Sequence, residues 1–274
     1  MANISAADVN KLRQMTGAGM MDCKKALEET GGDFEKAIDH LRKKGQKIAA
    51  KRADRDANEG IVLARANEEK TYAGMIMVNC ETDFVGKTDQ FRQFAKDLLD
   101  LGVAHKPKTV EELKGLKLNN VTVADLLNDM LGKTGEKIQI AHYEFLEAPI
   151  VAAYNHHGNR LGTLLGLSKK SAEIAHELAM QVAAMNPIAV DTKDVPQEVI
   201  DREMEIGKEQ ARQEGKPEEM LEKIAAGKLN KFFKERTLLN QDFVRDTKKT
   251  VRQFLSEHDK EITVTGFKRL MLGE

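Results

Sequence analysis

Residues 79–86, Asn-Cys-Glu-Thr-Asp-Phe-Val-Gly, place two carboxylates and an aromatic ring directly after an apolar stretch. A chain that leaves an apolar strand ordinarily turns polar, yet here Asp83 is followed at once by Phe84. A charge beside an aromatic ring offers recognition chemistry, since aromatic side chains dominate the energetics of contacts between proteins. This pair therefore suggests a probe for a partner protein.

Two regular elements must position this pair. Residues 71–80 are apolar enough for a buried strand, and residues 88–103 carry apolar side chains along one helical face. Phe84 then lies on the connection between them, where side chains usually point outward. The alternative, that Phe84 folds back onto the core, stays open because large apolar residues are mostly buried.

The sequence contains no recognisable catalytic or metal-binding motif. It has neither G-x-x-x-x-G-K-[ST] nor G-x-G-x-x-G, and residues 16–19, Thr-Gly-Ala-Gly, follow an expected helix and suit a turn. The seven histidines show no H-E-x-x-H, and the two cysteines, Cys23 and Cys80, form no C-x-x-C. His156 and His157 precede a glycine and suit an exposed polar turn. We expect no metal and no cofactor; no motif points to a Ser-His-Asp or Cys-His triad, although that alternative stays open.

The charge balance argues against nucleic acid and membrane partners. Lys and Arg number 43 against 44 for Asp and Glu, which gives a net charge of −1 at pH 7. No apolar stretch reaches the roughly eighteen residues of a membrane span, and the low cysteine content without a signal sequence suits a reducing cytoplasm. Residues 43–55 are basic but lack aromatic residues for stacking on RNA, so they suit a solvated helical or flexible linker.

The chain divides into a small helical module and a larger core. Residues 1–45 predict three short helices, with Ser5 and Asp33 as capping residues, and residues 46–59 form the basic linker. Two hairpin-plus-helix units then predict an α+β core of two related subdomains, residues 60–149 and residues 150–190 with 238–274. The expected strands are 61–66, 71–80, 137–147, 150–155, 161–167 and 261–272, and the expected helices are 88–103, one from Ser171, and 247–258.

An inserted arm interrupts the second subdomain. Residues 191–237 are heavily charged, with only a narrow apolar stripe and a Gly-Lys-Pro break at 215–217. This pattern predicts two antiparallel helices that project from the core.

Two long motifs give the chain a family resemblance. Residues 16–27, Thr-Gly-Ala-Gly-Met-Met-Asp-Cys-Lys-Lys-Ala-Leu, and residues 78–85, Val-Asn-Cys-Glu-Thr-Asp-Phe-Val, closely resemble bacterial translation elongation factor Ts. The resemblance covers nearly the whole chain. It implies a ubiquitin-associated-like module, the two subdomains and an antiparallel coiled-coil arm, in the order that the segmentation gives.

The resemblance also implies a function. Members of this family are nucleotide exchange factors for the GTPase elongation factor Tu, which release GDP so that GTP can bind, and they catalyse no covalent reaction. An Asp-Phe wedge would perturb Mg²⁺ and phosphate binding in the partner. No direct nucleic acid or membrane contact is expected, and a homodimer that gives a 2:2 complex is left open.

By motif, the resemblance assigns partner contacts to three groups of residues. The wedge would comprise Thr82, Asp83, Phe84 and Val85; the N-terminal module would contribute Lys11, Leu12, Met20 and Met21; the second subdomain would contribute His157. Leu12 and one of the methionines fit the core of the small module equally well, so that alternative stays open.

The chain departs from the family pattern at two positions. Gly86 stands where the family frequently has Ala, which is expected to loosen the wedge, and Thr134 stands where Ile is common. The given chain ends at Glu274, where some relatives continue into a further helical module, so partner contacts by such a module stay an open question.

Two other classes of protein compete with this interpretation. A ubiquitin-like-binding or scaffold adaptor would use the helical module for recognition and the arm for dimerisation. A hydrolase with an unrecognised site would show turnover with no GTPase present. Phe84 separates the exchange factor from the adaptor, because an adaptor has no use for an exposed Asp-Phe pair.

Overall fold

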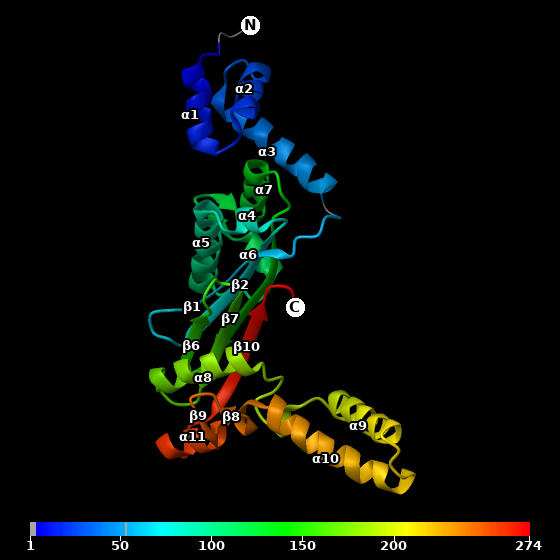
Figure 1. Ribbon diagram of the computed structural model, residues 1–274. Coiled ribbons are helices and arrows are strands. Elements are labelled where there is room, and N and C mark those ends of the chain that lie inside the picture. The colour runs from blue at the N-terminus through cyan, green and yellow to red at the C-terminus, as the bar shows by residue number, and fades with distance from the viewer. Residues whose placement is uncertain (1–3, 53) are drawn as a thin grey trace.

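The computed structural model describes residues 4–52 and 54–274, with the side chains of 46–51 not described. A three-helix module lies at one end of the molecule, a core with two three-stranded sheets follows, and a helical arm projects from the far end (Figure 1). The fold class is α+β, with the N-terminal helices and the helix-and-sheet core as the sequence predicts.

Three helices form the N-terminal module: α1 (Ala6–Thr16), α2 (Met20–Glu29) and α3 (Phe34–Lys51). Ser5 and Asp8 form a capping box that starts α1, and Gly17 ends it in the left-handed conformation at φ 68°. Helix α3, the longest of these three, continues beyond residue 45, so the start of the basic segment is helical, one of the two forms that its sequence allowed. The side chains of Lys47 and Lys51 in that segment lie outside the described residues.

The first sheet contains β1 (Glu59–Ala66), β2 (Tyr72–Cys80) and β5 (Gln139–Glu147), in the antiparallel order β1-β2-β5. Every residue of β2 is buried, and α5 (Asp89–His105) covers the sheet with the apolar face that its periodicity predicts. Smaller elements complete this unit: α4 (Asp83–Gly86), α6 (Val110–Gly115), β3 (Lys117–Leu118), β4 (Val121–Thr122) and α7 (Val123–Thr134).

The second sheet repeats this plan. Its strands β6 (Ile150–Asn155), β7 (Leu161–Leu167) and β10 (Val264–Met271) follow the order β10-β7-β6, and α8 (Ala172–Met185) packs on it. In both sheets the hairpin's second strand lies in the middle and a strand from later in the chain pairs with it. An apolar layer that includes Val62, Met75, Val151 and Leu164 joins the two sheets.

The arm leaves and rejoins the second unit. It consists of α9 (Gln197–Gln213) and α10 (Glu218–Arg236), which pack together along their lengths (Figure 1) and are joined by a turn with Gly215 at φ 74°. Gly207 allows the close approach, since a Cβ there would lie 3.1 Å from the Ala225 Cα. Short 3₁₀ helices, η1 (Thr192–Asp194) and η2 (Leu238–Asn240), lie at its base.

The predicted helix 247–258 begins too early. Residues Asp246–Thr250 form β9, which pairs with β8 (Asp242–Phe243), and only α11 (Val251–His258) is helical. A capping box between Thr250 and Gln253 fixes the helix start at this point.

Within residues 4–52 and 54–274, no helix is both long enough and apolar enough to cross a membrane.

Candidate functional site

The predicted connection between β2 and α5 folds into a one-turn helix, α4. Thr82 caps it, because its Oγ1 accepts a hydrogen bond from the Val85 N–H at 3.4 Å and its carbonyl accepts one from the Gly86 N–H at 3.2 Å. Asp83 occupies the first turn, where a negative charge suits the helix dipole. Thr88 then caps α5 in the same way. Local sequence therefore holds this segment in a defined shape.

This short helix presents Phe84 to solvent. The Phe84 side chain is 81% exposed, the highest fraction among the large apolar side chains that the structure describes. The opposite face of α4 packs inward, with Val85 against the core of the first unit and Gly86 buried beside Cys80. The alternative in which Phe84 folds back onto the core is therefore wrong, because Val85 and Gly86 already occupy that face.

The neighbouring carboxylate of Asp83 is charged and partly exposed. Its Oδ2 lies 2.5 Å from the Lys87 Nζ, one helical turn away. This hydrogen-bonded ion pair lowers the pKa of Asp83 from its ordinary value. The exposed end of α4 thus carries an ionised carboxylate next to an aromatic ring, as the sequence motif suggested.

A second carboxylate, Glu136, holds the base of α4. Its Oε2 accepts a hydrogen bond from the Thr82 N–H at 3.0 Å, and its Oε1 accepts one from the Thr82 Oγ1 at 2.6 Å. Glu136 follows Gly135, whose φ of 71° ends α7. Thr134, at the position where the family commonly has Ile, accepts a hydrogen bond from the Glu136 N–H at 3.2 Å. Its hydroxyl thus supports the turn that carries Glu136.

A third carboxylate, Glu81, binds groups from two other parts of the chain. It accepts hydrogen bonds from the Lys137 N–H at 2.7 Å, from Arg52 Nη1 at 2.7 Å and from Arg55 Nη1 at 3.0 Å. Burial opposes ionisation, but these three donors outweigh it and lower the pKa of Glu81 to about 2. Glu81 is therefore ionised at neutral pH.

Cys80 is a structural residue. It is fully buried, and its Sγ donates to the Thr82 carbonyl at 3.1 Å. Burial, together with the negative charges of Glu136 and Glu59, raises the pKa of this thiol to about 12. A thiol held protonated in this way is a poor nucleophile.

The N-terminal residues assigned by resemblance divide into exposed and buried ones. Met20 and Met21 are exposed, as is Met15 nearby, and Lys11 is exposed with its Nζ 5.2 Å from the centre of the Phe34 ring. Leu12 is fully buried in the core of the module. The assignment of Leu12 as a contact residue is thus corrected, because a module this small needs its side chain in the core.

His157 is exposed in the turn between β6 and β7, as its place in the sequence predicts. The turn lies beside the first sheet, since the Val62 N–H donates to the Asn159 carbonyl at 2.7 Å. The structure therefore places the predicted contact residues on three separate elements. These are α4, the N-terminal module and the turn of the second sheet.

Sequence reasoning missed Glu81, Glu136, Arg52 and Arg55 as functional candidates. Glu81 belongs to the motif that carries the resemblance, so its position was a usable signal. The other three lie 26 to 54 residues from their partners along the chain, and only the fold brings them together. In the described part of the chain, no group of three or more His, Cys, Asp or Glu side chains could hold a metal ion.

Comparison with known proteins agrees with this architecture. A family model described as "Elongation factor TS" matches residues 81–274. Elongation factor Ts of Amoebophilus asiaticus (strain 5a2) is 50% identical over 274 residues, which cover 98% of this chain and 99% of that protein. The elongation factor Ts proteins of Cytophaga hutchinsonii and Prosthecochloris aestuarii are 49% and 45% identical, each over the full length of both chains. This chain therefore belongs to the elongation factor Ts family.

Proposed function

We propose that this protein is a guanine nucleotide exchange factor for the translational GTPase elongation factor Tu. Its membership of the family supports this role, and the observation that carries it is the 81% exposure of Phe84 on a capped, internally supported helix. An isolated Phe exposed to water gains nothing from the hydrophobic effect, whereas insertion into a partner would bury it. Aromatic side chains of this kind are frequent hot spots of binding.

In this proposal, α4 inserts into the GTPase near the residues that support its Mg²⁺. Mg²⁺ requires near-ideal octahedral geometry and bridges phosphate oxygens of the nucleotide. A small displacement of its supporting residues therefore weakens GDP binding. Phe84 acts as the wedge, Asp83 brings a negative charge beside it, and Thr82 and Val85 fix the helix on which both stand.

Linkage makes this effect reciprocal. A factor that lowers the affinity of the GTPase for GDP must bind the GDP-loaded form less tightly than the empty form by the same ratio. Rebinding of GTP then expels the factor by the same coupling. This cycle needs no covalent chemistry from the factor itself.

Further contacts would come from the other exposed residues. Met20 and Met21 offer adaptable apolar surface on the N-terminal module, with Lys11 beside them as a charge, and His157 would contact the partner from the second unit. The proposal also includes a ubiquitin-associated-like N-terminal module and a coiled-coil arm. It places the protein in the cytoplasm, without direct contact to nucleic acid or membrane. A homodimer that gives a 2:2 complex stays open.

Stopped-flow release of a fluorescent GDP from elongation factor Tu tests this function. Wild-type protein should accelerate GDP release. The acceleration by Phe84→Ala should be about a hundredfold smaller, as the loss of a hot spot worth ~2–3 kcal/mol predicts. Met220→Ala is the matched control, because it removes another exposed apolar side chain, on the arm. No acceleration by the wild-type protein would contradict the exchange-factor role and favour the adaptor.

A further inference from the structure

Two carboxylates interlock the end of β2 with the loop that follows α7. Glu81 at the end of β2 accepts a hydrogen bond from the Lys137 N–H at 2.7 Å, and Glu136 accepts one from the Thr82 N–H at 3.0 Å. Each segment thus supplies a carboxylate to a backbone N–H of the other. This interlock lies directly before α4, so the base of the wedge cannot shift without breaking it.

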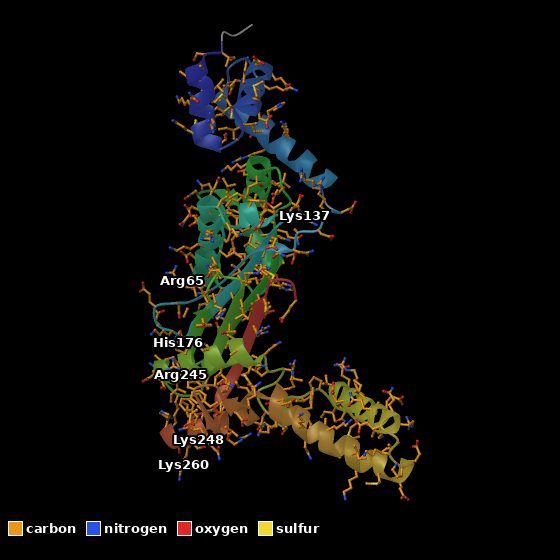
Figure 2. All side chains as sticks on the ribbon, viewed as in Figure 1. Arg65, Lys137, His176, Arg245, Lys248 and Lys260 are labelled. Carbon is orange, nitrogen blue, oxygen red and sulfur yellow. The ribbon has the colours of Figure 1, made fainter. Side chains whose placement is uncertain are left out.

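The same groups also bind the segment that connects the N-terminal module to β1. Arg52 and Arg55 donate to the two oxygens of Glu81, and the Lys137 Nζ donates to the Arg55 carbonyl at 2.9 Å. Asn79 donates to the carbonyl of Ala57 at 2.7 Å. Figure 2 shows Lys137 where the chain from the module enters the core. We call this set of contacts, centred on Glu81, the linker clasp.

The burial of Glu81 makes the linker clasp more than a surface ion pair. Its side chain is only 12% exposed, whereas Arg52 is 28% and Arg55 58% exposed. Exposed ion pairs contribute little because water screens them, but hydrogen bonds to a mostly buried carboxylate are stronger and removing its donors is costly. The contact through Arg52 is therefore the stronger of the two arginine contacts.

The module also packs directly on the core, where a Cβ at Gly45 in α3 would lie 3.0 Å from the Asn128 carbonyl oxygen in α7. Helix α3 lies against α7, with Arg42 and Asp129 separated by 3.9 Å. A cavity of about 200 Å³ remains between the module and α7, lined among others by Met15, Leu41 and Lys133. The α3–α7 contact is therefore one attachment of the module to the core, and the linker clasp is a second, separate one.

We propose that Glu81 is a positioning residue that fixes the N-terminal module relative to Phe84 through Arg52 and Arg55. This inference rests on the proposed exchange function. Two binding elements held at a fixed separation bind a partner more tightly than two loosely tethered ones, because less freedom is lost on binding. The clasp thus serves affinity for the GTPase, while Phe84 serves the release of GDP.

Separate kinetic quantities distinguish these two roles. In Arg52→Ala/Arg55→Ala, Glu81 keeps its bond to the Lys137 N–H and α4 stays intact. The linker loses both side-chain contacts to Glu81 but keeps the bonds of its backbone carbonyls to Lys137 and Asn79. The concentration of factor that half-saturates GDP release should rise roughly tenfold, the equivalent of about 1.4 kcal/mol, with the maximal release rate unchanged. Phe84→Ala should instead lower the maximal rate of GDP release.

A distance measurement tests the clasp without the GTPase. Spin labels at Gln14→Cys in α1 and Lys96→Cys in α5 occupy exposed positions, and the native Cys23 and Cys80 are buried. The distance distribution should be narrow in the parent and broad in Arg52→Ala/Arg55→Ala and in Glu81→Gln. Lys208→Ala/Arg212→Ala is the matched control, since it removes two ion-paired cations from the arm.

Three outcomes decide the proposal. Broadening with a raised half-saturating concentration supports it. An unchanged distribution in the arginine variant overturns it, and so does a fall in the maximal rate at an unchanged half-saturating concentration, because the clasp would then act on α4 alone. If the parent fails to accelerate GDP release, the exchange function fails, and the distance measurement still decides whether the clasp fixes the module.

Discussion

The two units of the core share one topology but differ at equivalent connections. In the first unit, the connection from β2 to α5 forms α4 and exposes Phe84. In the second, residues 168–171 connect β7 to α8, and Lys169 is held by Asp259 and Glu261, each at 2.7 Å. The fold can therefore close this connection with polar residues alone. The shared topology therefore does not require an exposed ring at this point, which supports the partner-binding role proposed for Phe84.

The contacts that support the two connections also differ, because those of the first unit are more buried than those of the second. Glu81 and Glu136 accept several hydrogen bonds from a mostly buried or half-buried position, including backbone N–H groups. The Lys169 pairs are largely exposed, with Glu261 at 80%. Burial thus concentrates rigidity at the connection that carries the ring, as expected for a preorganised binding element.

The largest effect should come from moving the aromatic ring between the two connections. The double variant Phe84→Ala/Lys170→Phe transfers the ring to an exposed position of the second connection. GDP release should stay about a hundredfold slower than with wild-type protein, because that connection lacks both the one-turn helix and its supports. Stopped-flow fluorescence measures the rate. Recovery of activity would mean that any exposed ring on the core suffices.

The next effect concerns the support beneath α4. Glu136→Ala removes the two carboxylate oxygens that accept hydrogen bonds from the N–H and the hydroxyl of Thr82. The free energy of unfolding should fall by about 1–3 kcal/mol, and GDP release should slow as α4 loses its fixed position. Chemical denaturation measures the first effect. In the second unit, Lys169→Ala should change the free energy of unfolding little, because water screens its exposed ion pairs, and should leave exchange unchanged. Equal losses of stability in both variants would remove the difference between the connections.

The linker clasp also predicts a pH dependence. The pKa of Glu81 is lowered to about 2 in the folded protein from an ordinary value of 4.5. Its stabilisation is therefore complete above about pH 4.5 and is lost as the pH falls toward 2. The difference in unfolding free energy between wild type and Glu81→Gln, about 1–2 kcal/mol at pH 7, should persist at pH 5 and shrink below pH 4. A difference that shrinks between pH 7 and 5 would contradict an ionised, donor-bound Glu81.

The smallest effect is expected at Gly86. A Cβ at this position would lie 3.4 Å from the Cys80 Sγ and 3.5 Å from Gly60, which is ordinary contact. Gly86→Ala should therefore raise the free energy of unfolding by about 0.5 kcal/mol and leave GDP release unchanged or slightly faster. Gly60→Ala is the contrasting control, because its Cβ would lie 2.1 Å from the Val78 carbonyl oxygen and should destabilise the protein strongly. Destabilisation by Gly86→Ala would show that α4 requires glycine at its end.

Periodicity in the sequence predicts most of the fold. The alternating and helical patterns identified both hairpins, α5, α8 and the arm, because one buried face dominates each of these elements. The pattern failed at residues 246–250, where a short strand is followed immediately by a helix. It also gave no sign of α4, because a single helical turn is too short to show a period.

The candidate site was predictable only in its exposed parts. Phe84, Met20, Met21 and His157 are exposed as the resemblance implied, whereas Leu12 could not be assigned before the module's core was known. The linker clasp arises from long-range contacts, such as the bond from Arg52 to Glu81 across 29 residues. No local pattern encodes such a pairing, so only the fold reveals it.

The most direct test of the central claim is the Mg²⁺ dependence of GDP release from elongation factor Tu. The rate should be measured with wild-type protein and with Phe84→Ala, each in excess Mg²⁺ and in excess chelator. If the wedge acts by displacing the support of the metal, wild-type protein should accelerate release strongly with Mg²⁺ and much less without it. Phe84→Ala should lose mainly the Mg²⁺-dependent part. Equal acceleration by both proteins in Mg²⁺ would contradict the account.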